Sequence, residues 1–208
     1  MFGIHDYWLF VLSAVLLNLA PGQDTLYILG RSIGQGRRIG IASALGVSAG
    51  TLVHTFAAAL GLSAIVAASA SAFLVIKLVG AAYLVYLGVR AIVAPSTMLD
   101  VDTQAIGDAR AAFRHGLVTN VLNPKVGLFF LAFLPQFVSS GTLHATYGFL
   151  LLGLTFVATG TVWVLVLAVA ASSVRGFLER RRAAQAWLSR TMGGVFVYLG
   201  VRLAMADR

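Results

Sequence analysis

Two side chains of opposite charge, Asp24 and Lys125, each lie close behind a proline inside a long apolar stretch. The other six acidic residues fall in predicted loops or tails, so Asp24 is the one carboxylate expected at membrane depth. An ionisable group at that depth costs about 2.5–3.5 kcal/mol on insertion scales and marks a functional site by default. A carboxylate and an ammonium that share one cavity suit the two charged ends of a zwitterionic solute.

Both prolines interrupt predicted membrane helices. Proline has no backbone N–H, so Pro21 leaves the carbonyl of Leu17 without its helical donor, and Pro124 does the same to the carbonyl of Asn120. Lipid offers no replacement donor, and broken backbone at membrane depth is tolerated only where it lines a polar cavity or is covered by protein. We therefore expect the two breaks to face each other around a solute-binding site.

Each polar group at the two breaks has a role in this hypothesis. Asp24 exchanges a proton for the ammonium of the substrate, since a protonated carboxyl is cheaper to bury than a charged one. Lys125 and the N–H groups of the half-helix that follows Pro124 hold the substrate carboxylate. Asparagine side chains satisfy the exposed backbone. The predicted substrate-binding residues are Asn18, Pro21, Gly22, Asp24, Asn120, Asn123, Pro124 and Lys125.

Three of the polar residues also have a plainer interpretation. Asp24 can cap the helical segment that follows it, as aspartate often does at a helix start. Lys125 can extend its ammonium to the membrane surface. His54, in the second span, is a candidate for proton coupling together with Asp24, or it can simply hydrogen-bond to a neighbouring helix. The sequence leaves these alternatives open.

Composition places the chain in a membrane. Hydrophobic residues make up 59% of its 208 positions and charged residues 11%, and the mean hydropathy is +0.91. A soluble domain carries about a quarter charged residues and could not bury so much apolar side chain. The sequence predicts an all-α integral membrane protein, with one transporter domain over residues 1–208. Six transmembrane helices are predicted, at 7–30, 39–68, 73–93, 117–138, 145–174 and 187–205, the first and fourth being broken.

The net charge of +8 follows the predicted loops. Basic residues gather after the first, third and fifth spans, and the connections near positions 70 and 140 carry none. Because basic loops stay in the cytoplasm, the N- and C-termini are both predicted outside the cytoplasmic membrane. A nucleic-acid partner would need a soluble basic face, so none is expected. The basic residues of these loops are Arg31, Arg37, Arg38, Arg90, Arg110, Arg114, Arg175, Arg180, Arg181 and Arg182.

A short repeat indicates two related halves. The motif YLGVR at 86–90, near the end of the third span, recurs at 198–202 near the end of the sixth. Three spans per half would place the second half upside down relative to the first, which is the inverted-repeat plan of many secondary transporters. The halves are predicted at about 1–95 and 112–208, joined by a cytoplasmic linker at about 95–113. A broken span opens each half.

Several other functions lack the residues they need. The chain has no cysteine, so no disulfide and no thiolate metal site can form, and no cofactor is expected. The pattern G-x-S-x-G at 46–50 indicates helix packing, within one chain or in a homo-oligomer, because a hydrolase would need a strand-to-helix turn there. No enzymatic activity is expected. Two alternatives to a carrier of amino acids remain: export of an inorganic cation or small toxic solute, and a membrane scaffold that transports nothing.

The chain also resembles the LysE/RhtB family of amino-acid exporters through most of its length. The most specific match is the run that begins NPK at 123–125 and continues through a phenylalanine-rich segment. The other matching stretches are NLAPG at 18–22, GQGRR at 34–38, the run 46–61 with His54, and the run 77–90.

The resemblance implies an inner-membrane carrier that expels amino acids or close derivatives by antiport, driven by the proton motive force. Its partners would be the amino acid, protons and the lipid bilayer. One position departs from the family, which commonly shows a second proline where this chain has Gln23. We expect a softer break there.

Overall fold

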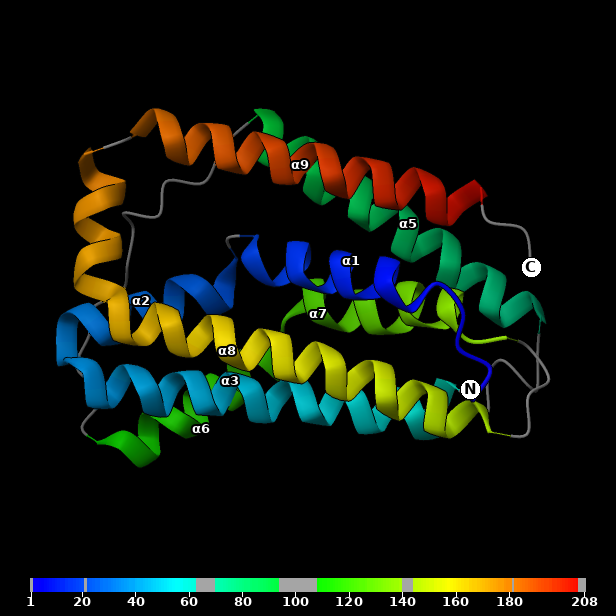
Figure 1. Cartoon of the computed structure of the whole chain (residues 1–208), viewed down its shortest axis with the longest axis horizontal. Helices are drawn as coiled ribbons and strands as arrows, with labels where there is room; N and C mark the ends of the chain where they lie inside the picture. Colours follow the sequence, from blue (N-terminus) through cyan, green and yellow to red (C-terminus); the bar gives the residue numbers. More distant parts are fainter. Residues whose placement is uncertain are drawn as a thin grey trace.

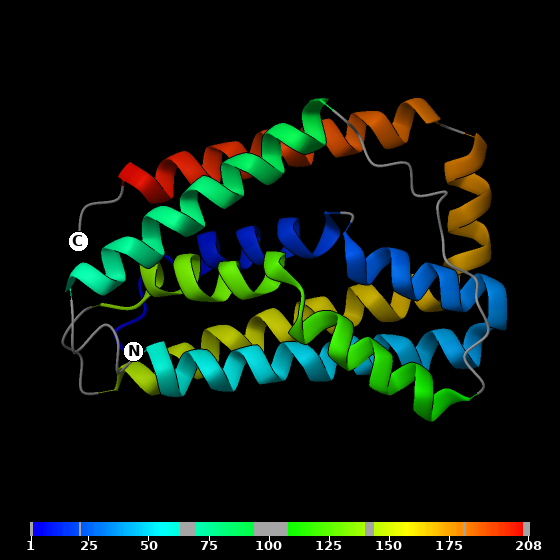
Figure 2. The ribbon, with the colours of Figure 1, turned by 180° about the vertical axis from the view of Figure 1, so that it is seen from behind.

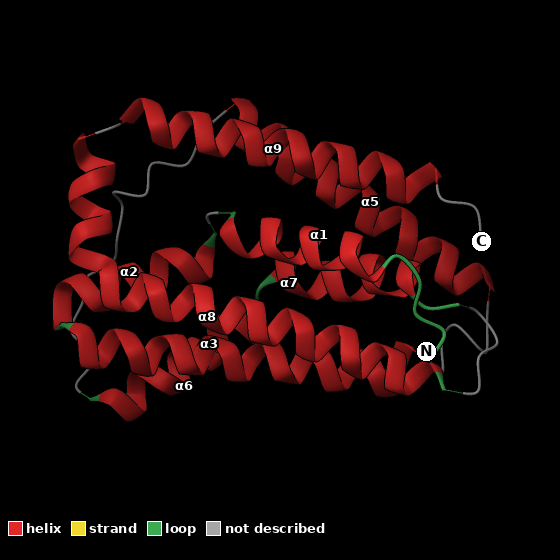
Figure 3. Ribbon diagram, in the orientation of Figure 1, coloured by secondary structure: helices red, strands yellow, loops and turns green. Residues whose placement is uncertain are grey.

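The computed structural model describes residues 2–20, 22–62, 70–93, 108–139, 144–180 and 182–205. These residues are almost entirely helical, and β-structure among them is limited to one isolated bridge between Ile4 and Val138 (Figure 3). The predicted all-α class is confirmed. The elements are α1 (Tyr7–Leu19), α2 (Gln23–Gln35), α3 (Arg37–Ala57), η1 (Ala58–Leu62), α5 (Ala70–Val93), α6 (Ala109–Val121), α7 (Pro124–Leu128), η2 (Phe129–Phe133), η3 (Leu134–Phe137), α8 (Ala145–Arg180) and α9 (Arg182–Met205).

Most of the helices run back and forth along one long axis, and the last turns of α8 bend across it (Figure 1). The start of α1 and the end of α9 lie at one end of the molecule, and the α2–α3 junction and the start of α6 lie at the other (Figure 1). Within the described residues, the segments Arg37–Gly61 and Ala145–Ala171 are long and apolar enough to cross a membrane. Two bent helix pairs raise the number of candidate spans to four. The exact number of six spans stays a prediction.

The first helix is broken where the sequence predicts. α1 ends at Leu19 and α2 begins at Gln23, and the directions of the two helices differ by 49°. The backbone is extended at Ala20 and at Gly22. Pro21 itself lies outside the described residues.

The fourth predicted span is also broken, between α6 and α7, with a bend of 45°. Asn123 has extended backbone there, and its side-chain oxygen accepts a hydrogen bond from the N–H of Lys125 at 3.0 Å. Pro124 follows at the first helical position, where its missing N–H would have had no helical partner. The break therefore has the usual form of a capped helix start.

Two features of this span differ from the prediction. The helix begins at Ala109 rather than near 117, because the Asp108 side chain caps it by accepting from the N–H of Ala111 at 2.7 Å. Beyond α7 the chain widens into the π-helical turn η2 and then tightens into the 3₁₀ turn η3. Pro135 lies in η3 and lacks the N–H that an α-helix would need, which accounts for the change of helix type.

Buried apolar residues form two clusters. The aromatic core joins α1, η2, η3 and α8, and the rings of Phe129 and Phe156 within it lie 5.0 Å apart. The aliphatic core joins α2, α3 and α8. The aromatic core is built around Phe10, Phe129, Phe130, Phe133, Phe137, Phe149 and Phe156, and the aliphatic core consists of Ile28, Leu29, Ala44, Val47, Val164, Leu167, Ala168 and Ala171.

Glycines bring α5 and α9 together along one side of the molecule (Figure 2). A Cβ atom on Gly88 would lie only 2.5 Å from a backbone oxygen of α9, and one on Gly200 would lie 2.8 Å from a backbone oxygen of α5. The contacts repeat with a constant offset of 112 positions, which is also the offset of the YLGVR motif. The corresponding residues are Gly88 and Gly200, Ala81 and Gly193, and Val85 and Val197.

Candidate functional site

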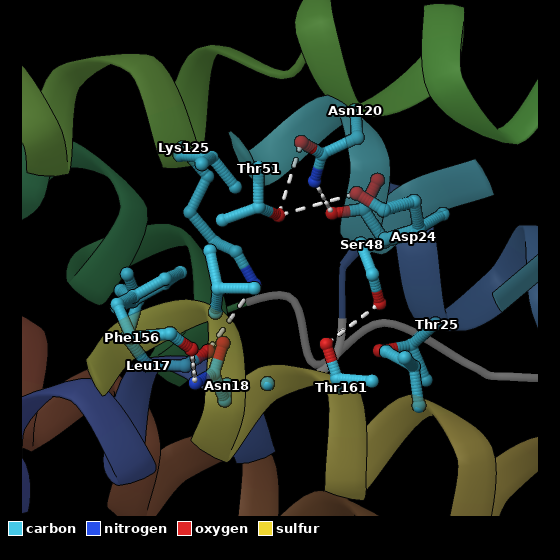
Figure 4. A pocket seen from close by; sticks show the side chains of 15 residues that line it. Leu17, Asn18, Asp24, Thr25, Ser48, Thr51, Asn120, Lys125, Phe156 and Thr161 are labelled. Carbon is cyan, nitrogen blue, oxygen red and sulfur yellow. Dashed lines mark hydrogen bonds between the residues drawn. The ribbon is translucent and has the colours of Figure 1, made fainter. Parts of the chain in front are cut away.

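A small polar cavity lies where the two helix breaks meet (Figure 4). Its volume is about 30 Å³, which is room for one or two water molecules. Leu17 and Phe156 of the aromatic core line it together with Val47 and Val164 of the aliphatic core, so it lies between the two clusters. The polar residues that line it are Asn18, Asp24, Thr25, Ser48, Thr51, Asn120, Lys125 and Thr161.

Asp24, in the first turn of α2, is held through one carboxylate oxygen. Its Oδ2 accepts hydrogen bonds from the side-chain amides of Asn120 and Asn123, each at 2.9 Å. Its Oδ1 is buried and has no hydrogen-bond partner, an arrangement that calls for a proton or a cationic ligand. Gly22 occupies the N-cap position of α2, so the alternative in which Asp24 serves as the cap does not describe this helix.

The ammonium of Lys125 lies against the break in the first helix. It donates to the carbonyl oxygen of Leu17 at 3.3 Å and to that of Ala20 at 3.1 Å. A Cβ on Gly22 would lie 3.0 Å from the ammonium, so the absence of a side chain there leaves room for it. Lys125 therefore binds the broken backbone instead of reaching for the membrane surface. The expected pairing with Asp24 is not direct, because each charge takes other partners on the same cavity.

Asn120 connects three elements around the second break. Its side chain donates to Asp24 and accepts from the Thr51 hydroxyl at 3.2 Å. Its carbonyl, which Pro124 deprives of a helical donor, lies 3.1 Å from Nε2 of His54. A carbonyl can only accept, so Nε2 carries the proton. The plainer interpretation of His54, a hydrogen bond to a neighbouring helix, is thus confirmed, and its part in proton coupling stays a prediction.

The asparagines do more than satisfy exposed backbone. Asn18 reaches α8, where it donates to the Thr159 hydroxyl at 3.2 Å and to the carbonyl of Phe156 at 3.5 Å. Asn123 uses its oxygen to cap α7 and its amide to bind Asp24. Because that cap takes the N–H of Lys125, the prediction that this N–H serves the substrate carboxylate needs correction. The Lys125 ammonium stays available as a donor to that carboxylate.

Not every predicted residue reaches the cavity. Gly22, Asn123, Pro124 and His54 do not line it, and His54 is bonded to the carbonyl of Asn120, which does. Pro21 lies outside the described residues. Among the residues that the structure describes, no three acidic, histidine or cysteine side chains gather as a metal site.

Hydroxyl groups are the part of the site that sequence reasoning missed. Thr161 on α8 donates to Ser48 on α3 at 2.9 Å, and Ser48 donates to the carbonyl of Ala44 at 3.1 Å. Thr51 lies one turn beyond Ser48 on the same face of α3. The spacing was visible in the sequence, but hydroxyls in membrane helices usually bond to their own backbone, so it did not show which of them reach another helix.

Comparison with known proteins places these observations in a family. The family model described as "LysE type translocator" matches residues 15–207. The chain is 32% identical to the "uncharacterized membrane protein PA4757" of Pseudomonas aeruginosa, over 98% of this chain and 97% of the relative. It is 27% identical to a leucine efflux protein of Salmonella typhimurium and 29% identical to one of Klebsiella pneumoniae, each time over 98% of this chain and 96% of the relative.

No solved structure matches the chain. Members of the matching family are transporters rather than enzymes, as the sequence predicts. With the family model covering 15–207 and a relative above 30% identity along almost the whole length, the resemblance noted in the sequence is confirmed: the chain belongs to the LysE type translocators.

Proposed function

We propose that the protein exports an amino acid across the cytoplasmic membrane in exchange for protons. The observation that carries the proposal is the cavity between the two helix breaks, which brings the carboxylate of Asp24 and the ammonium of Lys125 together with accepting backbone carbonyls. These groups complement the ammonium and the carboxylate of an amino acid. Two relatives along almost the whole chain are named leucine efflux proteins, which supports the same substrate class.

Lys125 holds the place of the substrate ammonium. In this structure its own ammonium occupies the carbonyls of Leu17 and Ala20. When an amino acid binds, its ammonium replaces that of Lys125 on these carbonyls and approaches Oδ1 of Asp24. Lys125 then turns to the substrate carboxylate. One ammonium replaces another, so the carbonyls keep a donor at every stage, as the membrane interior requires.

Export requires the cavity to widen on one side of the membrane and then on the other. The segment suited to this movement is α2, which carries Asp24 and has a possible hinge at each end. One hinge is the break at 20–22, and the other is Gly36, whose φ of 86° and ψ of 169° are open almost only to glycine. A rotation of α2 away from α3 and α8 would part the aliphatic core and admit the substrate.

Asp24 is the group that exchanges the proton, and His54 assists it through Asn120. A proton on Asp24 neutralises the carboxylate when no substrate ammonium is present, which lowers the cost of returning it through a low-dielectric interior. Histidine is a common member of proton relays in membrane transporters. His54 lies 3.1 Å from the carbonyl of Asn120, the residue whose side-chain amide binds Asp24.

The topology that goes with this function is six transmembrane helices in two inverted halves, with both termini outside. The constant offset of 112 positions between corresponding contacts of α5 and α9 supports it, because a two-fold relation between halves makes each contact occur twice. The starts of α3 and α6, with Arg37 and Arg110, share one end of the molecule, opposite the start of α1 and the end of α9 (Figure 1). This agrees with one basic, cytoplasmic end.

Export of labelled leucine from preloaded cells tests the proposal. Asp24→Asn and Lys125→Met are compared with the wild type at equal membrane abundance. We expect both variants to lose at least about nine-tenths of export, because each removes a charge that binds the substrate. Undiminished export in both would exclude the site. Cells without the protein should also become hypersensitive to leucine-containing dipeptides, and unchanged sensitivity would favour a scaffold.

A further inference from the structure

We infer that one face of α8, presenting Val157, Thr161 and Val164, contacts the side chain of the substrate and selects amino acids with uncharged, aliphatic side chains. This inference rests on the proposed function and adds the residues that determine specificity. The three residues line the cavity together with Gly160. Their positions i, i+3, i+4 and i+7 fall on a single stripe of an α-helix.

The charged groups of the cavity bind the two ends of the substrate backbone, so the stripe on α8 is the wall that remains for the substrate side chain. Asp24 and Lys125 come from α2 and α7, and they are engaged by the charged ends of the substrate in the proposed function. Asn18, which borders them, lies close enough to α8 that a Cβ on Gly160 would be 3.1 Å from its side-chain oxygen. The stripe therefore passes close to Asn18 at Gly160, and Thr161 beside it faces Ser48 of α3 (Figure 4).

The hydroxyls on this side of the cavity are occupied with each other. The Thr161 hydroxyl donates a hydrogen bond to the Ser48 hydroxyl, which in turn donates a hydrogen bond to the carbonyl of Ala44. Neither hydroxyl has a proton left for a substrate, since each carries only one. The other residues that line this wall are the apolar Val157, Val164 and Val47.

The charges that line the cavity also favour a substrate with an uncharged side chain. Of the described residues that line the cavity, Asp24 and Lys125 are the ones that carry charge, and the substrate backbone uses both. The side chain of lysine, arginine, aspartate or glutamate would find no counter-charge, and burying it unpaired is strongly unfavourable. An aliphatic side chain instead gains by burial against the valines.

Competition export tests the inference. Cells are preloaded with labelled leucine, threonine, phenylalanine and lysine, and the export rate of each is measured. We expect the wild type to export leucine at least about tenfold faster than lysine. In Val157→Thr, where a hydroxyl replaces one methyl group, the ratio of leucine to threonine export should fall about tenfold. In Val157→Ala, which removes two methyl groups, the ratio of phenylalanine to leucine export should rise at least about tenfold, since one methylene in a hydrophobic pocket changes selectivity by about 10–200-fold.

Val162 provides the matched control, since it lies on the same helix with 65% of its surface exposed. Val162→Thr and Val162→Ala should leave every ratio as in the wild type. Val157 variants that export leucine with wild-type ratios would overturn the inference while leaving the proposed function intact. Equal export of lysine and leucine by the wild type would also overturn it. If the wild type exported none of the four amino acids, both the proposed function and this inference would be refuted.

Discussion

The ammonium of Lys125 lies 3.3 Å from the carbonyl oxygen of Leu17, the carbonyl that Pro21 deprives of its helical donor. A side chain of the second broken helix thus repairs the backbone of the first. At the second break the carbonyl of Asn120 accepts from the backbone N–H of Asn123 at 2.9 Å, and Nε2 of His54 is a second donor at 3.1 Å. At both breaks a side chain of another helix binds the carbonyl that lost its helical donor, which ties three helices together at the cavity.

Gly22→Ala should disturb the Lys125 ammonium without disturbing the fold. The backbone of Gly22 is extended, a conformation open to alanine, and the added methyl would meet only the flexible end of Lys125 at 3.0 Å. We expect normal membrane abundance and an about fivefold weaker apparent affinity for the exported amino acid, because in the proposed function the substrate ammonium takes this same position and would meet the added methyl. Concentration-dependent export measures it, with Gly194→Ala, which has open space around it, as the control. An unchanged affinity would show that this ammonium position is irrelevant to binding.

Asn123→Ser separates two tasks of one side chain. Serine keeps the cap of α7, because it is as good an N-cap as asparagine, but it is too short to donate to Asp24. We expect the lost bond to Asp24 to cost about 1.5–3 kcal/mol of thermal stability and to slow export several-fold. Asn123→Ala loses the cap as well and should cost about 1 kcal/mol in addition. Thermal unfolding in detergent and leucine export are compared. If the serine variant exported at the wild-type rate, the bond from Asn123 to Asp24 would have no part in transport.

His54→Gln tests proton coupling against a bridging role. Glutamine can still donate an N–H to the carbonyl of Asn120, but it does not titrate near neutral pH. We expect normal abundance and an export rate that varies less with external pH between about 5.5 and 7.5 than in the wild type. His54→Phe removes the donor too and should lower abundance. A glutamine variant with the full wild-type pH profile would leave His54 only its bridging role.

Gly88→Ala and Gly200→Ala should destabilise the protein by similar amounts. Each added methyl would meet backbone of the facing helix, at 2.5 Å and 2.8 Å respectively, where no flexible side chain can yield. Overpacking of this kind costs about 1–3 kcal/mol. Thermal unfolding of both variants measures it, with Gly194→Ala on α9 expected to be neutral. Strongly unequal losses would speak against a two-fold relation between α5 and α9.

The sequence predicts the two breaks well because their cause is covalent. A proline in an apolar stretch cannot donate, whatever surrounds it, so the positions of both kinks and the need for a polar partner follow directly. The early start of α6 was also within reach, since Asp108 precedes Ala109 as an ordinary N-cap. The change from α-helix to π-helix and then to 3₁₀-helix before and at Pro135 could not be predicted, because it depends on packing in the aromatic core.

The choice of partners inside the site is where sequence reasoning fails. Asp24 and Lys125 invite a direct pair, yet two amides take the carboxylate and two carbonyls take the ammonium. All these groups lie within reach of one another, and the outcome depends on rotamers and helix positions rather than on residue type. The aliphatic stripe of α8 was hidden for a similar reason, because every predicted span is rich in valine and the sequence does not say which face turns inward.

The donors of the Asp24 carboxylate come 96 and 99 residues later in the chain. During synthesis, α1 and α2 therefore reach the bilayer well before anything can solvate this acid. A nascent first half must keep it protonated or close to the headgroups until α6 arrives. Docking of α6 then supplies the amides that solvate the acid, so the buried carboxylate couples the first half of the chain to the second before α8 closes the cavity.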